Sequence, residues 1–516
     1  MMPRQIDPFE PHPRFENAAG ARFWPDTLFV DLSAYPDEVQ SFDYDEMRLL
    51  EEADLSIFVA AAARTHEQLH WLQLAGTSFG RFLAFNRVTT GDLADAILTT
   101  ATPAELAALK DQRNRGVAPA QRDRQGQLRH AFGYSTTVQS LFDHWWATVA
   151  LEHFLIDDGI PLLGPIDPRF MVGLGLRYVA AGEDLRSVFN APDETFLKTT
   201  LALGPSDEFS SFPRQSRLTV RHIEEAAALV EQYLCHADFA RQLPDERSVE
   251  FGARALAVTL ERFMDKRHSL YTEALNFYVQ HIPGDDVPHF FELFLLICDI
   301  ALNPVIPSDG SPLDCTWDEF HPVGRFERLV SGLATFKPVC GGLENAPAMC
   351  WWLNERERLV THVGLGDDPH SAAFYPTELP SLDPLHQPSD CLRQFLAMAG
   401  TNLSSLRRKF PAAIASPLHS LQDDMQAFVG LVDSLEGPGF DPPLNIKSFG
   451  DGERSLSISA KLYVETLFAV TARRAVHSWL VRSGDLNFSG LPTDRVGQLA
   501  QEAAAQRLRD LYGIVA

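Results

Sequence analysis

Residues 56–76 read SIFVAAAARTHEQLHWLQLAG, and this stretch decides how the chain is interpreted. Neither glycine nor proline occurs from Ser56 through Leu74, and the four alanines Ala60–Ala63 strongly favour a helix. Gly76 is typical of the position just past a helix end. The stretch therefore predicts one amphipathic helix that ends near residue 75.

Two histidines of this helix have the spacing of a metal site. His66 and His70 are four residues apart, so on a helix they lie on one face about one turn apart and can bind a single metal ion. Glu67 is turned about 100° from His66, which suits a base beside a metal and does not suit a ligand. Gln73 follows near the same face and is expected to be a hydrogen-bond donor behind the ligands.

The motif His66-Glu67-Gln68-Leu69-His70 resembles the HExxH signature of zinc metallopeptidases, the zincins. No histidine occurs in residues 71–80, so the resemblance is to the gluzincins, and in particular to uncharacterised bacterial proteins of that type. It covers the motif and one further helix. It implies Zn²⁺ as cofactor, a third ligand Glu from a downstream helix, Glu67 as general base, and a peptide or protein substrate.

Two glutamates compete for the position of third ligand. Glu225 is followed by three alanines, which would let its helix pack closely against the helix of the motif. Glu250 also precedes small residues. A solvated position on a helix is the ordinary environment of either glutamate. We favour Glu225 and keep Glu250 as the alternative.

Helical periodicity dominates the chain beyond a short N-terminal region. The only good strand candidate there spans residues 27–32. The expected fold is mainly α: a multi-helix, zincin-like catalytic region with a minor N-terminal β element and a helical C-terminal region. Long Pro-rich or Gly-rich loops near 303–310, 363–390 and 437–443 suggest a division into an extended segment 1–43, a motif-bearing helical domain 44–303 and a helical domain 304–516. Helices are predicted near 44–75, 91–110, 134–157, 219–242, 247–282, 286–302, 321–336, 346–359, 391–408, 417–435, 455–482 and 493–512.

Composition narrows the class of protein. A formal net charge of -25 disfavours nucleic-acid binding, which needs a basic surface. The six cysteines form no CxxC pair and suggest free thiols in a reducing compartment. The chain begins without the apolar core of a signal peptide, and charged residues interrupt its longest apolar run, so we expect a cytoplasmic protein without a membrane span. The oligomeric state stays open.

Three other readings compete with the zinc peptidase. The first is a non-catalytic helical binding or scaffold protein in which the motif is incidental or a relic. The second is a serine hydrolase, because residues 76–80 match GxSxG with Ser78 as nucleophile, although that motif needs a preceding strand. The third is a di-iron carboxylate protein built on Glu67-x-x-His70. It needs a second ExxH, and the chain offers only Asp versions, among them those at 265–268, 318–321 and 383–386.

Overall fold

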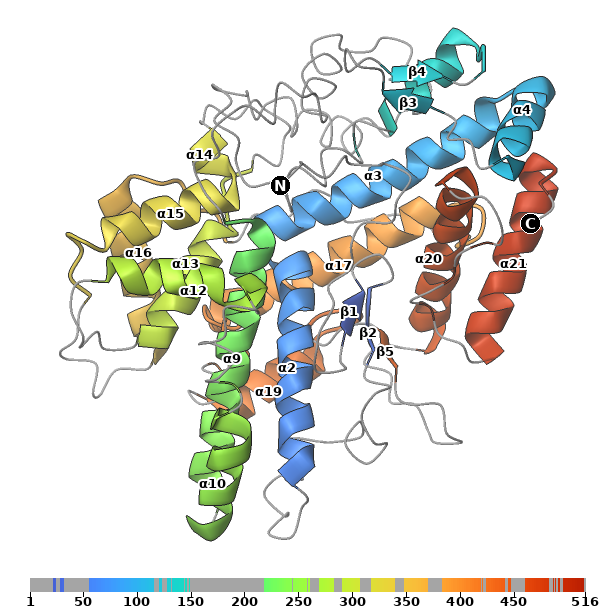
Figure 1. Ribbon diagram of the computed structural model, residues 1–516. Coiled ribbons are helices and arrows are strands. Elements are labelled where there is room, and N and C mark those ends of the chain that lie inside the picture. The colour runs from blue at the N-terminus through green and yellow to red at the C-terminus, as the bar shows by residue number, and fades with distance from the viewer. Residues whose placement is uncertain are drawn as a thin grey trace.

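The computed structural model of the protein describes most of the helical part of the chain. The described residues are 22–24, 28–31, 55–115, 120–122, 128–130, most of 132–148, most of 218–259, 269–282, 290–306, 317–338, 348–369, most of 383–420, 424–440, 444–446, 460–481, 486, 488, 491 and 495–514. Most of them lie in helices, so the chain is mainly α-helical, as predicted (Figure 1).

The motif lies on α2 (Leu55–Gly76), which ends where the sequence predicts. The next helix, α3 (Ser78–Thr100), begins after a single residue, because the Thr77 side chain accepts a hydrogen bond from the backbone N–H of Gly80. A Cβ at Gly80 would lie 2.1 Å from the carbonyl oxygen of Gln73, so only glycine lets α3 meet α2 this closely. The sequence pattern predicts a helix that starts only at residue 91, and this start is wrong. The small residues at 76–80 suggest a loop, but Thr77 caps a new helix there.

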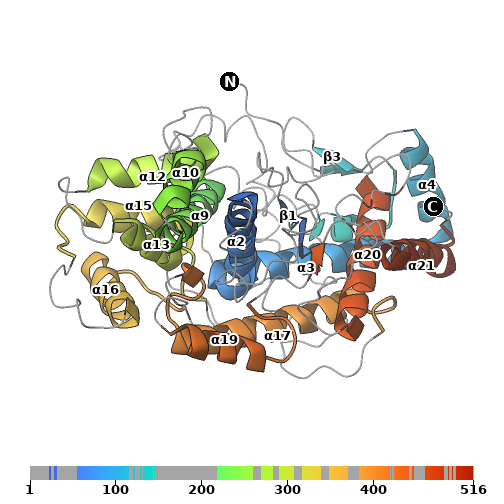
Figure 2. The ribbon, with the colours of Figure 1, turned by 90° about the horizontal axis from the view of Figure 1, so that it is seen from below.

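A second long helix, α9 (Val220–Gln242), packs along α2 (Figures 1 and 2). It begins at Thr219, whose side chain and backbone exchange hydrogen bonds with His222 in a capping box. The small, buried side chains of Ala226–Ala228 allow the two helices to approach.

The described residues of the predicted helix over 247–282 are nearly all helical. Helix α10 (Asp245–Phe251) continues directly into the π-helical turn η3 (Gly252–Leu256), and α12 (Ser269–His281) packs against α9; residues 260–268 lie outside the described part. The apolar run that follows forms α13 (Phe290–Ala301), a buried helix as expected.

The remaining helices surround these. In Figure 2, α17 runs alongside α3 and reaches α20, and α20 and α21 lie side by side. Their bounds are α4 Pro103–Asn114, α14 Trp317–Phe320, α15 Pro322–Gly332, α16 Ala348–Val363, α17 Pro388–Lys409, α19 Met425–Ser434, α20 Ala460–Val481 and α21 Arg495–Tyr512.

Short strands complete the fold. The strand expected at 27–32 is present as β2 (Phe29–Asp31), which pairs antiparallel with β1 (Arg22–Trp24) and parallel with β5 (Leu444–Ile446). A separate hairpin joins β3 (Ala120–Arg122) and β4 (Leu128–His130). The β1–β2–β5 sheet lies beside α2, so residues more than 400 positions apart meet next to the motif.

A network of buried ion pairs ties the centre of the fold together. Asp299, near the end of α13, pairs with Arg356 of α16 and with Arg407 of α17, and Arg356 also pairs with Asp367. The guanidinium of Arg325 donates to the last carbonyl groups of α13. The main hydrophobic core likewise contains residues from both sides of position 304. The division into domains at that position stays a prediction.

Within the described part of the chain, no helix has the length and apolar character to cross a membrane.

Candidate metal centre

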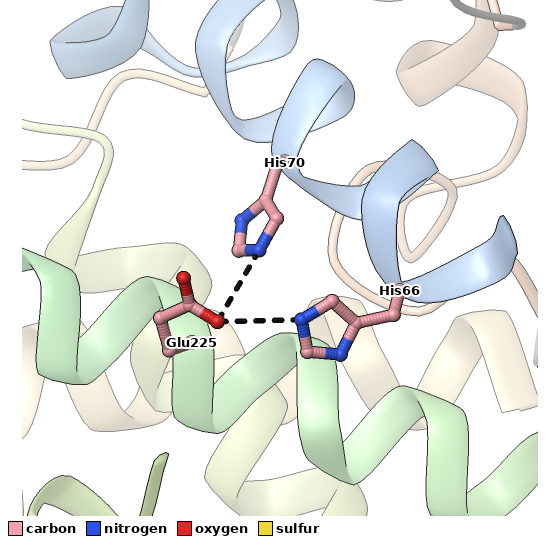
Figure 3. A group of neighbouring side chains, drawn as sticks. All are labelled: His66, His70 and Glu225. Atoms are coloured by element: carbon pink, nitrogen blue, oxygen red, sulfur yellow. Dashed lines mark hydrogen bonds and ion pairs between the residues drawn. The ribbon is translucent and has the colours of Figure 1, made fainter. Parts of the chain in front are cut away.

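Three buried side chains from two helices converge in the interior. His66 and His70 project from α2 with ring centroids 5.0 Å apart, and Glu225 projects from α9 toward both rings (Figure 3). The Oε2 atom of Glu225 lies 3.3 Å from Nε2 of His66 and 3.5 Å from Nε2 of His70. One possible ligand atom from each residue lies within 4.8 Å of the other two. The side chains are only 2–4 % exposed.

The packing of α9 against α2 brings Glu225 to the histidines. The cap at Thr219 sets the start of α9, and the three alanines after Glu225 are buried. Glu250 is exposed on α10 and belongs to no cluster of possible ligands among the described residues. The structure therefore places Glu225, and not Glu250, beside the histidine pair.

The hydrogen-bond partners of the two imidazoles differ. Nδ1 of His70 lies 3.1 Å from the amide oxygen of Gln73, and the amide nitrogen of Gln73 donates to the backbone carbonyl of Glu224 at 3.3 Å. Gln73 thus accepts from the histidine, whereas the sequence suggested a donor. Nδ1 of His66 is buried and has no hydrogen-bond partner among the described residues.

Glu67 lies beside the cluster and is not part of it. Its side chain is buried, and its Oε2 accepts a hydrogen bond from the backbone N–H of Phe23 at 2.7 Å. Phe23 belongs to β1, so the short N-terminal strand holds this carboxylate. No sequence pattern signalled this contact, because it depends on where the strand packs.

The charges in the cluster are strongly coupled. Burial alone would lower the pKa of the His70 imidazole, but the negative charge of Glu225 and the hydrogen bond to it raise the pKa to about 9. Burial likewise disfavours the ionised form of Glu225, yet the attraction of His70 and the hydrogen bonds from both imidazoles hold the pKa of its carboxyl well below the usual range. Burial raises the pKa of the neighbouring Glu224 to about 7. Without metal, His70 and Glu225 thus form a buried ion pair.

The donor set fits a transition-metal ion. Two imidazole nitrogens and one carboxylate oxygen are the three protein ligands of many catalytic zinc sites. The Nδ1 atom of His70 faces a hydrogen-bond acceptor, and its Nε2 atom faces the centre of the cluster, which is the orientation of a histidine that binds metal through Nε2.

The serine-hydrolase and di-iron readings receive no comparable geometry. Ser78 follows helix α2 and not a strand, and its buried hydroxyl donates to the carbonyl of Pro304, so the strand–turn–helix of a nucleophile elbow is missing. His321 caps α15, and Asp383 and His386 pair with each other at the surface. The Asp-x-x-His at 265–268 lies outside the described residues. None of the described Asp-x-x-His pairs belongs to the cluster.

No protein-family model matches the chain, and no curated protein or solved structure matches it either. The fold and the site therefore define the class by themselves. The chain is a mainly α-helical protein with a buried His/His/Glu group that resembles the metal site of an HExxH protein with a third glutamate ligand.

Proposed function

We propose that this chain is a metal-dependent hydrolase, a zinc peptidase in which His66, His70 and Glu225 hold the metal. One observation carries the proposal: a carboxylate from a distant helix lies 3.3 and 3.5 Å from the two motif imidazoles. An HExxH match can arise by chance on one helix, whereas the third donor on a separate helix is an independent observation. Zinc bound by three such ligands acts as a Lewis acid and lowers the pKa of water.

Glu67 is the general base in this proposal. It is next to a ligand in sequence but faces β1, where the Phe23 N–H holds one carboxylate oxygen. A hydrogen bond to one oxygen restrains the orientation of the carboxylate, and in this proposal the carboxylate accepts a proton from the attacking water. The substrate class, a peptide or protein, rests on the resemblance of the motif to metallopeptidases.

The test measures zinc content and hydrolytic activity in the same set of variants. Purified protein should carry close to one zinc per chain by elemental analysis, and His66→Ala with His70→Ala should abolish binding. Glu67→Gln preserves size and the acceptor for the strand, so it should keep fold and zinc while hydrolysis falls by about 10²-fold or more. Glu250→Gln, an exposed change on α10, is the matched control and should retain full activity.

A screen with casein and a mixed peptide library, with and without chelator, measures that activity. Hydrolysis that survives both the chelator and Glu67→Gln would rule out the zinc peptidase. Loss of activity in Ser78→Ala, with Glu67→Gln fully active, would support the serine hydrolase instead. Two bound irons per chain would support the di-iron reading.

A non-catalytic role is the second candidate, and burial favours it. The three cluster residues and Glu67 are all nearly inaccessible to solvent. A closed site suits a structural metal or a buried ion pair better than turnover of a large substrate. The two candidates differ in the test above, because the structural role predicts metal and stability effects with no hydrolysis in any variant.

A further inference from the structure

The side chain of Gln73 is buried, 4 % exposed, and contacts both helices of the candidate centre. Its oxygen faces Nδ1 of His70 at 3.1 Å. Its nitrogen donates at 3.3 Å to the carbonyl of Glu224, which belongs to the peptide group preceding Glu225. One amide therefore touches a candidate ligand on α2 and the backbone next to another on α9.

The carbonyl of Glu224 determines which atoms carry hydrogens in the contacts that run from Glu224 through Gln73 to His70. A backbone carbonyl can only accept, so the carbonyl of Glu224 must face the NH₂ group of Gln73. The oxygen of Gln73 then faces His70 and can only accept, so Nδ1 of His70 must carry a hydrogen. In a neutral imidazole the lone pair is then on Nε2, the atom that faces Glu225.

We propose that Gln73 is a positioning residue of the metal centre: it fixes His70 as an Nε2 ligand and ties it to the peptide group next to Glu225. The proposal rests on the proposed function, because it assigns a role around the same metal. His66 lacks such support, since its Nδ1 has no partner among the described residues. The centre thus has one fixed histidine and one that is held only at its metal-facing side.

An amide serves this position better than a carboxylate. Glu67, Glu224 and Glu225 already place their negative charges close enough to act on His70. A fourth carboxylate would add another buried charge, whereas an amide supplies both an acceptor and a donor without charge. The donor is needed because the carbonyl of Glu224 accepts.

The chain offers a matched control on the same helix. Gln68 is also buried, and its side-chain nitrogen donates to the backbone carbonyl of Phe440 at 3.3 Å. Gln68→Leu and Gln73→Leu each remove a buried amide that donates to a carbonyl. The side-chain amide of Gln68 thus reaches Phe440, whereas that of Gln73 reaches His70 of the cluster.

The experiment measures zinc affinity of the full chain by competition with a chromophoric chelator. Gln73→Leu should weaken zinc binding about 10- to 100-fold, whereas Gln68→Leu should leave it within about threefold of wild type. Gln73→Glu keeps an oxygen acceptor for His70 but loses the donor to the carbonyl of Glu224, so it should restore only part of the affinity. In zinc-loaded wild type, ¹⁵N spectra of the imidazoles should show the proton of His70 on Nδ1.

Each contrary result has a distinct meaning. Equal affinities of Gln73→Leu and Gln68→Leu, or zinc-loaded His70 with its proton on Nε2, would overturn the role of Gln73 while leaving the metal site intact. If Gln73→Leu does not fold, zinc-loaded Gln73→Glu decides through its ¹⁵N spectra: a proton of His70 on Nδ1 supports the role of the acceptor at position 73, and a proton on Nε2 refutes it. Wild type that fails to bind zinc would instead refute the proposed function itself.

Discussion

Zinc binding should expel about one proton per metal ion at pH 7.5, and the proton should come from His70. In the metal-free protein the charge of Glu225 raises the pKa of His70 to about 9. A pH of 7.5 is well below that pKa, so most of the imidazole is protonated. A metal ion needs the neutral ring, so binding must displace this proton.

Isothermal titration calorimetry in buffers of different ionisation enthalpy measures the proton directly. The slope of the observed binding enthalpy against the buffer enthalpy gives the number released. It should be close to one at pH 7.5 and fall toward zero above pH 9. The apparent zinc affinity should rise about tenfold per pH unit below pH 9 and then level off.

The matched variants separate this mechanism from general pH effects. Glu225→Gln removes the charge that raises the pKa of His70, so it should release much less than one proton at pH 7.5 and bind zinc more weakly. Glu250→Gln, exposed on α10, should match wild type. Tight zinc binding with no proton release at pH 7.5 would refute the prediction that zinc displaces a proton from His70.

Three further predictions concern stability. The first concerns His70, whose pKa is raised from 6.5 to about 9 in the folded protein. In the metal-free protein, its protonated imidazole should therefore contribute fully to the free energy of unfolding below pH 6.5, and about 3 kcal/mol of that free energy should be lost as the pH rises through 9. Urea unfolding with and without zinc would measure the loss. Asp299→Asn leaves two buried arginines without their shared carboxylate and should cost about 3–5 kcal/mol in urea unfolding, whereas the exposed control Asp383→Asn should change stability by less than about 1 kcal/mol. Gly80→Ala would press a Cβ against backbone and should lower stability by about 1–3 kcal/mol, whereas Gly430→Ala in α19, where a Cβ meets open space, should raise it by about 0.5–1 kcal/mol. A stable Gly80→Ala variant would show that α3 can shift away from α2.

Local signals predicted the helices well where caps and periodicity agree. The helix expected at 219–242 is observed at Val220–Gln242, because Thr219 supplies a cap before a regular apolar stripe. The start of α3 was missed because Gly76, Ser78 and Gly80 read as a loop, whereas Thr77 caps a new helix immediately. Small residues permit a close helix–helix junction as readily as a turn, and the sequence alone does not distinguish them.

The surroundings of the motif depend on tertiary packing and were less predictable. The alanines after Glu225 gave a physical reason to place α9 against α2, and the two helices do pack together. The role of Glu225 as a ligand stays a prediction. The contact of Phe23 with Glu67 could not be anticipated, because three-residue strands carry almost no periodic signal and β5, their third member, lies more than 400 residues away.

Charge balance favours a metal ion over a proton at the centre. The carboxyl groups of Glu67, Glu224 and Glu225 are all buried close to His70, and each acts on it electrostatically. A proton on His70 offsets one negative charge, and the raised pKa of Glu224, about 7, shows that burial still penalises the remaining charge. A divalent cation offsets two charges and releases both imidazoles to act as neutral ligands. Nitrogen ligands suit zinc and its neighbours, whereas magnesium and calcium prefer oxygen, so a metal bound by these donors would be expected to be zinc or one of its neighbours.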